Sequence, residues 1–146
     1  MKTILVTGGA GYIGSHTSIE LIKAGYEVVI VDNLSNSKKI AVDRIEQISG
    51  KKVAFYENDI LDRSALNKIF AAHKIDAVIN FAGLKAVGES VAKPVEYYHN
   101  NISGLLVLVE AMRDAGCKNL VFSSSATVYG KPHTVPITED FPLSTT

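Results

Sequence analysis

Apolar residues fall into short continuous runs along this chain, and between the runs lie longer stretches with a helical pattern of apolar and polar positions. Continuous short runs are typical of strands whose two faces are both buried, whereas the helical period is typical of helices packed on a sheet. We predict strands over residues 3–7, 27–32, 52–57, 76–81 and 119–124. We predict helices over residues 12–24, 39–48, 64–73 and 95–115.

This alternation of strands and helices predicts an α/β fold with a doubly wound parallel sheet. Strands that are buried on both faces belong to parallel sheets, and right-handed crossovers between them give the order 3-2-1-4-5. A complete sheet of this type usually has a sixth strand. We therefore expect a sheet that is incomplete at its carboxyl end, with residues 119–124 forming a bare apolar edge.

Three glycines follow the first predicted strand at intervals of three residues: Gly8, Gly11 and Gly14. Such a turn brings backbone N–H groups close to a pyrophosphate at the start of a helix, where the helix dipole favours negative charge. A side chain at Gly8 would strain the turn, one at Gly11 would block the phosphate, and one at Gly14 would push the helix away from the sheet. The triplet lies between a strand and a helix, so it predicts a Rossmann dinucleotide-binding domain.

Asp32 ends the second predicted strand. A carboxylate at this place can accept hydrogen bonds from both ribose hydroxyls of an adenosine, and it would repel a 2′-phosphate. The sequence therefore predicts NAD rather than NADP as the cofactor. Lys38 and Lys39 follow closely and weaken this preference without reversing it.

Further polar residues follow the other predicted strands, at the edge of the sheet where ligands bind in such folds. Asp59 could accept from the adenine amino group, although a turn acid would explain it equally well, and Lys85 could meet a phosphate, a sugar hydroxyl or only solvent. The hydroxyls of Ser123 and Ser125 would point into the cleft beside a nicotinamide, or would satisfy backbone groups at the strand end. Asn100, on the fourth predicted helix, could face the cofactor.

Composition excludes several other classes of function. The 146 residues suit one domain, and 15 basic residues balance 15 acidic ones, so nothing indicates a nucleic-acid or membrane-surface partner. Cys117 is the single cysteine, which rules out an internal disulfide and fits a reducing compartment such as the cytoplasm. The histidines show no metal-ligand spacing with Cys117, and neither a signal peptide nor a membrane-spanning run is evident.

Four segments together resemble a known family. Residues 7–14 (TGGAGYIG) match the extended short-chain dehydrogenase/reductase superfamily. Residues 81–90 (FAGLKAVGES), 97–98 (YY) and 122–130 (FSSSATVYG) are more selective. With them the chain is similar, over essentially all 146 residues, to the UDP-glucose 4-epimerases of the NAD-dependent epimerase/dehydratase family.

The resemblance implies an enzyme that holds NAD tightly and interconverts UDP-glucose and UDP-galactose through a 4-keto intermediate, as a homodimer in galactose metabolism. It implies that Ser125 hydrogen-bonds the reacting oxygen. It also implies cofactor contacts at Tyr12, Ile13, Asp32, Asn33, Leu34, Ser35, Asn36, Ser37, Asp59, Ile60, Phe81, Ala82, Gly83, Leu84, Lys85 and Asn100. Gly8, Gly11, Gly14 and Ser123 complete the expected cofactor site from their positions in the predicted fold.

One departure from the family concerns the catalytic base, which is the tyrosine of a Tyr-x-x-x-Lys motif. None of the six tyrosines here has a lysine four positions later. Residues 131–146 contain three prolines among polar residues and resemble the extended loop that precedes this motif in the family. We therefore expect an amino-terminal part of the enzyme, with a truncated NAD-binding domain over residues 1–146, no carboxyl-terminal UDP-sugar domain and no activity by itself.

Two other hypotheses stay open. The chain could belong to another extended-family enzyme, such as a sugar-nucleotide dehydratase or an NADP reductase, although residues 84–87 count against the first and Asp32 against the second. It could also be a non-catalytic nucleotide-binding module, which the missing Tyr-x-x-x-Lys motif would explain. Product analysis separates the enzymes, and a continuation of the natural gene into that motif would remove the main support for the module.

Overall fold

The computed structural model describes residues 1–145, and at its centre lies a sheet of five parallel strands. The strands are β1 (Thr3–Thr7), β2 (Glu27–Asp32), β3 (Ala54–Glu57), β4 (Ala77–Asn80) and β5 (Leu120–Phe122). They lie in the order β3-β2-β1-β4-β5, so the predicted order is confirmed.

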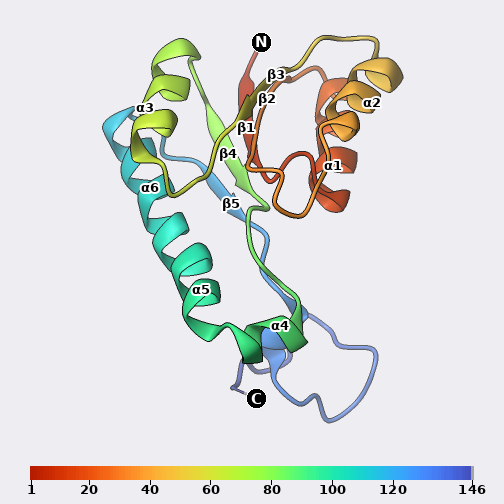
Figure 1. Ribbon diagram of the computed structural model, residues 1–146. Coiled ribbons are helices and arrows are strands. Elements are labelled where there is room, and N and C mark those ends of the chain that lie inside the picture. The colour runs from red at the N-terminus through yellow and green to blue at the C-terminus, as the bar shows by residue number, and fades with distance from the viewer. Residues whose placement is uncertain (146) are drawn as a thin grey trace.

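Helices cover both faces of the sheet, as Figure 1 shows. The four long helices are α1 (Tyr12–Lys23), α2 (Ile40–Ser49), α3 (Arg63–Ala72) and α6 (Gly104–Asp114). The first two pack on one face and the last two on the other. The predicted doubly wound α/β class is therefore confirmed.

The core consists of two apolar layers, one on each side of the sheet. Along β1, Leu5 points to the layer that contains Leu66 of α3 and Leu108 of α6. Its neighbours Ile4 and Val6 point to the opposite layer, against α1 and α2. Successive strand residues face opposite sides, so a strand covered on both sides must be apolar at every position. This explains the continuous apolar runs in the sequence.

The predicted helix over residues 95–115 is observed as one continuous helical segment, with a π-helical turn that was not predicted. Helix α5 (Pro94–Tyr98) runs into a π-helical turn, His99–Ser103, which continues into α6. A separate helix, α4 (Val87–Ala92), and a 3₁₀ turn, Ala126–Tyr129, were not predicted. Neither of these short elements buries a residue, so neither has the apolar stripe from which a helix is predicted.

The carboxyl ends of the strands meet at one edge of the sheet. The register pairs Thr7 with Val31 and with Asn80, and Asn80 with Phe122. The segments that follow these residues therefore begin side by side. Beyond this edge lie α4, α5 and the segment after β5 (Figure 1).

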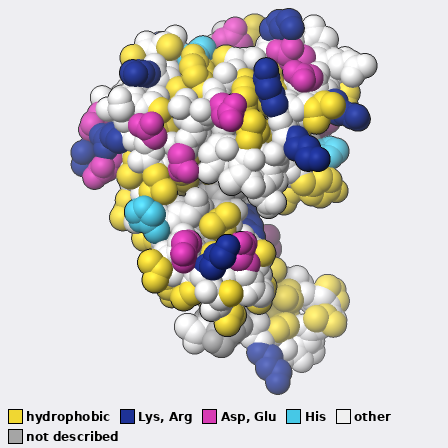
Figure 2. All heavy atoms as spheres, in the orientation of Figure 1, with side chains coloured by type: hydrophobic (Ala, Val, Ile, Leu, Met, Phe, Trp, Pro, Cys, Tyr) yellow, Lys and Arg dark blue, Asp and Glu magenta, His cyan; other side chains and the backbone are white. Residues whose placement is uncertain are grey.

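Two features of the structure bear on its binding partners: the distribution of charge on the surface and the length and apolarity of the helices. On the face shown in Figure 2, acidic and basic side chains are interspersed, without an extended patch of either sign. Within residues 1–145, no helix is both long enough and apolar enough to cross a membrane.

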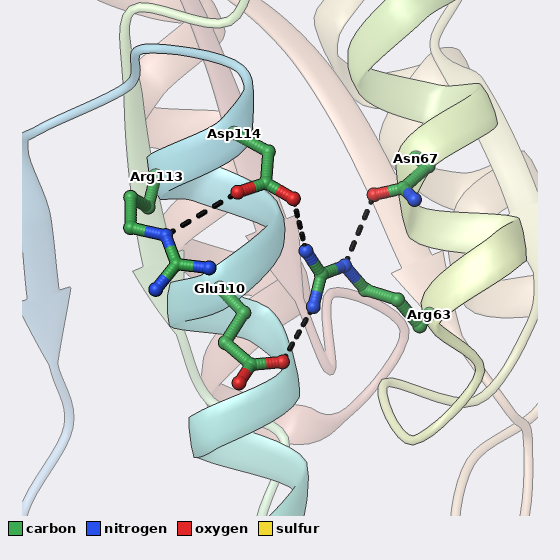
Figure 3. Close-up of polar contacts among 5 residues, drawn as sticks. All are labelled: Arg63, Asn67, Glu110, Arg113 and Asp114. Atoms are coloured by element: carbon green, nitrogen blue, oxygen red, sulfur yellow. Dashed lines mark hydrogen bonds and ion pairs between the residues drawn. The ribbon is translucent and has the colours of Figure 1, made fainter.

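An ion-pair network joins α3 to α6, as Figure 3 shows. The guanidinium of Arg63 donates through Nη1 to Glu110 Oε2 at 2.5 Å and through Nη2 to Asp114, while its Nε donates to Asn67 Oδ1 at 3.1 Å. Arg63 begins α3, and both carboxylates lie on α6. The network therefore crosses between two helices of the same layer.

We expect Arg63→Ala to lower the free energy of unfolding by about 1 kcal/mol, because one side chain pairs with two carboxylates and is only partly exposed. Urea denaturation measures the change, and 1 M salt should reduce it because such ionic strength screens charges beyond about 3 Å. Lys23→Ala is the matched control, since it removes one fully exposed pair with Glu20 and should cost less than about 0.5 kcal/mol. Equal losses for the two variants would contradict the prediction.

Candidate functional site

The glycine turn between β1 and α1 forms as the sequence predicts. Gly8 adopts a φ of 68°, and its N–H donates to Val31 O at 2.8 Å. A Cβ at Gly8 would also lie 2.8 Å from the backbone of both Phe81 and Ala82. A glycine at this position therefore lets the segment that follows β4 pass close to the turn. Helix α1 begins directly after Gly11, and its first N–H groups have no partners within the helix.

The reason for a glycine at position 14 differs from the prediction. A Cβ on Gly14 would lie 2.3 Å from Gly8 O and 2.8 Å from Gly9 Cα. The obstacle is thus the turn's own backbone, not the sheet. Gly14 lets the first turn of α1 close over the glycine turn.

Asp32 is held in a fixed orientation at the end of β2. Its carboxylate accepts from Ala10 N at 3.0 Å, from Leu34 N at 2.9 Å and from Ser37 Oγ at 2.9 Å. Only 9% of the residue is exposed. A carboxylate has about four acceptor positions. One position therefore stays open for a further donor.

A first cavity, of about 120 Å³, lies between the glycine turn and the segments after β2, β3 and β4. Asp32 lies in its wall, and Asn33 Nδ2 donates to Asp59 Oδ2 at 2.9 Å across the ends of β2 and β3. The residues that line this first cavity are Gly8, Gly11, Val31, Asp32, Asn33, Ser35, Asn36, Ser37, Asn58, Asp59, Ile60, Phe81, Ala82, Gly83, Leu84 and Asn100. The structure therefore brings most of the predicted cofactor residues together.

A second cavity, of about 340 Å³, adjoins the first, because the segment 81–84 lines both. The two adjoining cavities along the carboxyl edge of the sheet are called the groove below. Lys85, Ser123 and Ser125 lie in the second cavity, and Lys85 Nζ is 3.4 Å from Ser123 O. The groove thus has an acidic end and an end with hydroxyls and one cation.

Ser125 caps the 3₁₀ turn that follows β5. Its Oγ accepts from Thr127 N at 3.3 Å and from Thr127 Oγ1 at 3.0 Å. These contacts orient the Ser125 oxygen and leave its own proton available to donate into the second cavity.

Four predicted cofactor residues lie away from the lining of both cavities: Tyr12, Ile13, Gly14 and Leu34. Tyr12 and Ile13 are exposed on the first turn of α1. Leu34 adopts a φ of 56°, a left-handed conformation that costs a residue with a Cβ about 1–2 kcal/mol. Leu34 serves the site through its N–H, which donates to Asp32.

Sequence reasoning missed Asn101, which holds the shared segment in place. Its carboxamide accepts from Leu84 N at 2.8 Å and donates to Leu84 O at 2.8 Å, so it pairs with the backbone as a neighbouring strand would. Asn100 Nδ2 donates to Asn101 Oδ1 at 2.9 Å. The asparagine pair 100–101 was visible in the sequence, but the π-helical turn that presents it was not.

A sequence model described as GDP-mannose 4,6 dehydratase matches residues 5–146, and so includes both the glycine turn and Ser125. The chain belongs to this family.

Two curated proteins named UDP-glucose 4-epimerase are similar to this chain. The protein from Bacillus subtilis (strain 168) is 64% identical over 143 residues, which are 98% of this chain and 42% of that protein. The protein from Dictyostelium discoideum shows the same identity and coverage. The predicted resemblance is confirmed, and the chain spans about 42% of the length of these relatives.

Two solved structures of UDP-glucose 4-epimerases are similar to this chain. The structure from Bifidobacterium longum, in complex with NAD+ and UDP, has a TM-score of 0.95 and 55% identity, over 98% of this chain and 43% of that one. The structure from Brucella ovis, in complex with NAD, has a TM-score of 0.88 and 40% identity, over 100% of this chain and 42% of that one.

Proposed function

We propose that this chain binds NAD along the groove and supplies the NAD-binding part of a UDP-glucose 4-epimerase. The observation that carries the proposal is that segment 81–84 lines both cavities, which places them next to each other along the carboxyl edge of the sheet. An extended dinucleotide has two chemically different ends, and the groove has an end with Asp32 and an end with Ser125. The similar structures that contain NAD support the same ligand.

The first cavity binds the adenosine half in this proposal. The open acceptor position of Asp32 takes a ribose hydroxyl, and the second ribose hydroxyl can replace Ser37 Oγ on the carboxylate. The charge of Asp32 repels a 2′-phosphate, which favours NAD over NADP. The glycine turn and the start of α1 hold the pyrophosphate, and Asp59 accepts from the adenine amino group.

The second cavity takes the nicotinamide and the sugar of a UDP-sugar. When bound there, NAD would supply reversible hydride transfer at C4 of the sugar. The Ser125 hydroxyl donates to the reacting oxygen, and the Thr127 contacts keep it pointed at that place. Lys85 adds a positive charge beside Ser123, where a phosphate or a sugar hydroxyl can bind.

Proton removal from the sugar hydroxyl needs a base that we do not find among the tyrosines, since none precedes a lysine by four positions. We infer that the base and the UDP-sugar contacts come from sequence that the longer relatives carry. The chain alone is then a cofactor-binding unit without epimerase activity.

Calorimetry with NAD and with NADP tests the cofactor proposal. We expect binding of NAD and at least tenfold weaker binding of NADP. Failure to bind NAD by a protein that melts cooperatively would contradict the proposal. Assays of UDP-glucose and UDP-galactose interconversion test the second part: no product is expected from the chain alone, and full-length protein that binds NAD without epimerising would favour the non-catalytic module.

We also propose that two copies associate through α5 and α6. Exposed apolar residues follow one stripe along these helices: Val95, Tyr98, Ile102, Leu106 and Val109. Their spacing of three or four residues places them on one helix face, and exposed patches of this kind mark protein interfaces. A homodimer would bury the stripe against its own copy.

We expect Leu106→Glu to shift the protein from dimer to monomer, because it puts a charge at the centre of the stripe. Light scattering after size-exclusion chromatography measures the mass. Ile48→Glu is the matched control, since Ile48 is a similarly exposed apolar residue on α2 and should leave the mass unchanged. A wild-type protein that is monomeric at every concentration would contradict the dimer.

The proposed reaction places the protein in galactose metabolism, because it interconverts glucose and galactose as UDP-sugars. We propose the cytoplasm as its location. Cys117 is a buried thiol with no partner cysteine in the sequence, which suits a reducing compartment.

A further inference from the structure

Helix α4 forms one wall of the second cavity, but apolar burial does not hold it there. Val87 and Ser90 of α4 line the cavity together with Ser123 and Ser125. No residue of α4 is buried, and Val87 and Val91 are 73% and 79% exposed. Some other interaction must therefore keep α4 in position.

Tyr97 of α5 provides this interaction. Its hydroxyl donates to Glu89 Oε2 of α4 at 2.9 Å, and the residue is only 8% exposed. Lys93, between the two helices, adds a contact of 3.3 Å to Glu89 Oε1. Exposed ion pairs of the Lys93 kind stabilise little, whereas hydrogen bonds between a buried group and a charged acceptor stabilise more. The Tyr97–Glu89 bond is thus the main polar link between α4 and α5.

The protonation states suit this bond at neutral pH. The Tyr97 hydrogen bond, followed by Lys93, lowers the pKa of Glu89, so its carboxylate stays charged and accepts. Burial, followed by the Glu89 hydrogen bond, raises the pKa of Tyr97, so its hydroxyl stays protonated and donates.

Segment 84–89 is consequently attached to one continuous helix at both ends. Asn101, in the π-helical turn, pairs with the backbone of Leu84, and Tyr97, four residues earlier, pairs with Glu89. The segment between them carries Lys85 and Val87 into the second cavity.

We propose that Tyr97 is a positioning residue which, through Glu89, holds α4 against α5 and so sets the shape of the second cavity for the nicotinamide end of NAD. The assignment of that end rests on the proposed function above. Tyr97 also lines the second cavity itself, so its role there combines its own contact with its hold on α4, whereas it does not line the first cavity.

Tyr97→Phe tests the role, because the ring keeps its packing and only the hydroxyl is lost. We expect the Kd for NAD to rise roughly threefold to tenfold, which is the effect of losing one such hydrogen bond. The Kd for ADP, which fills the first cavity only, should stay unchanged. Hydrogen exchange of the α4 amides should become faster, with the exchange of β1 amides unchanged.

Two further comparisons distinguish a positioning role of Tyr97 from a general loss of folded structure. Glu89→Gln keeps an acceptor for Tyr97 and should restore most of the NAD affinity that Glu89→Ala loses. Tyr26→Phe removes the hydroxyl of a half-buried tyrosine away from the groove and should change neither ligand. Equal weakening of NAD and ADP in Tyr97→Phe, or unchanged α4 exchange, would overturn the role of Tyr97. Absence of NAD binding in the wild type would overturn the proposed function, and α4 exchange would still decide the role of Tyr97.

Discussion

Gly14→Ala is expected to lower the free energy of unfolding by about 3 kcal/mol and to abolish NAD binding. The added methyl would lie 2.3 Å from Gly8 O and 2.8 Å from Gly9 Cα. Both atoms belong to a backbone that the sheet and α1 hold on either side, so the methyl cannot be accommodated by a side-chain rotation. Domains of this kind have a total stability of roughly 5–15 kcal/mol, so a loss of this size removes a large share of it and lowers the melting temperature.

Urea denaturation and calorimetry with NAD measure the two effects of Gly14→Ala. Gly88→Ala is the matched control, because a Cβ there would meet no atom within 4 Å. Alanine is the better helix former by about 1 kcal/mol, so this variant should be neutral or slightly more stable. A Gly14→Ala protein as stable as Gly88→Ala would show that the turn can widen, contrary to our account of position 14.

Asp32→Asn is expected to weaken NAD binding at least tenfold and to remove most of the discrimination against NADP. Wild-type Asp32 accepts from three donors on the glycine turn and the following loop. A carboxamide has one oxygen, so its NH₂ group would face at least one of these donors. An unsatisfied buried donor costs about 1–3 kcal/mol, and the charge that repels a 2′-phosphate is gone.

Calorimetry with both cofactors and urea denaturation measure these changes in Asp32→Asn. The ratio of the two dissociation constants isolates the charge effect from any loss of stability. Asp43→Asn is the control, since Asp43 is an exposed acid on α2 outside both cavities. An Asp32→Asn protein that still rejects NADP as strongly as the wild type would assign the discrimination to another residue.

Local signals in the sequence were sufficient for much of the site. Gly8 could be predicted because a tight turn between a strand and a helix requires a residue that tolerates positive φ, and 68° is observed. Asp32 could be predicted because it ends a strand whose partners are set by the crossover rule. Both inferences depend on a few neighbouring residues and on general rules for parallel sheets.

Other features could not be predicted, because they depend on contacts between distant segments. Asn101 lies 17 residues from Leu84, and nothing in the helical pattern of its neighbours indicates a π-helical turn. Helix α4 has no buried stripe, so only its contact with Tyr97 explains its place. The reason for Gly14 was also misassigned, since its nearest atoms are those of the turn and not of the sheet.

The sequence by itself thus determined the α/β class, the strand order, the glycine turn and the acid at the end of β2, because each follows from local periodicity or from spacing after a strand. Only the tertiary structure decided how the groove is held: which groups bind Asp32, that segment 81–84 joins two cavities, and that Asn101 and Tyr97 fix the wall beside Ser125. These features depend on side-chain hydrogen bonds between distant segments. The packing of the whole fold determines which groups form these bonds, so no local sequence pattern predicts them.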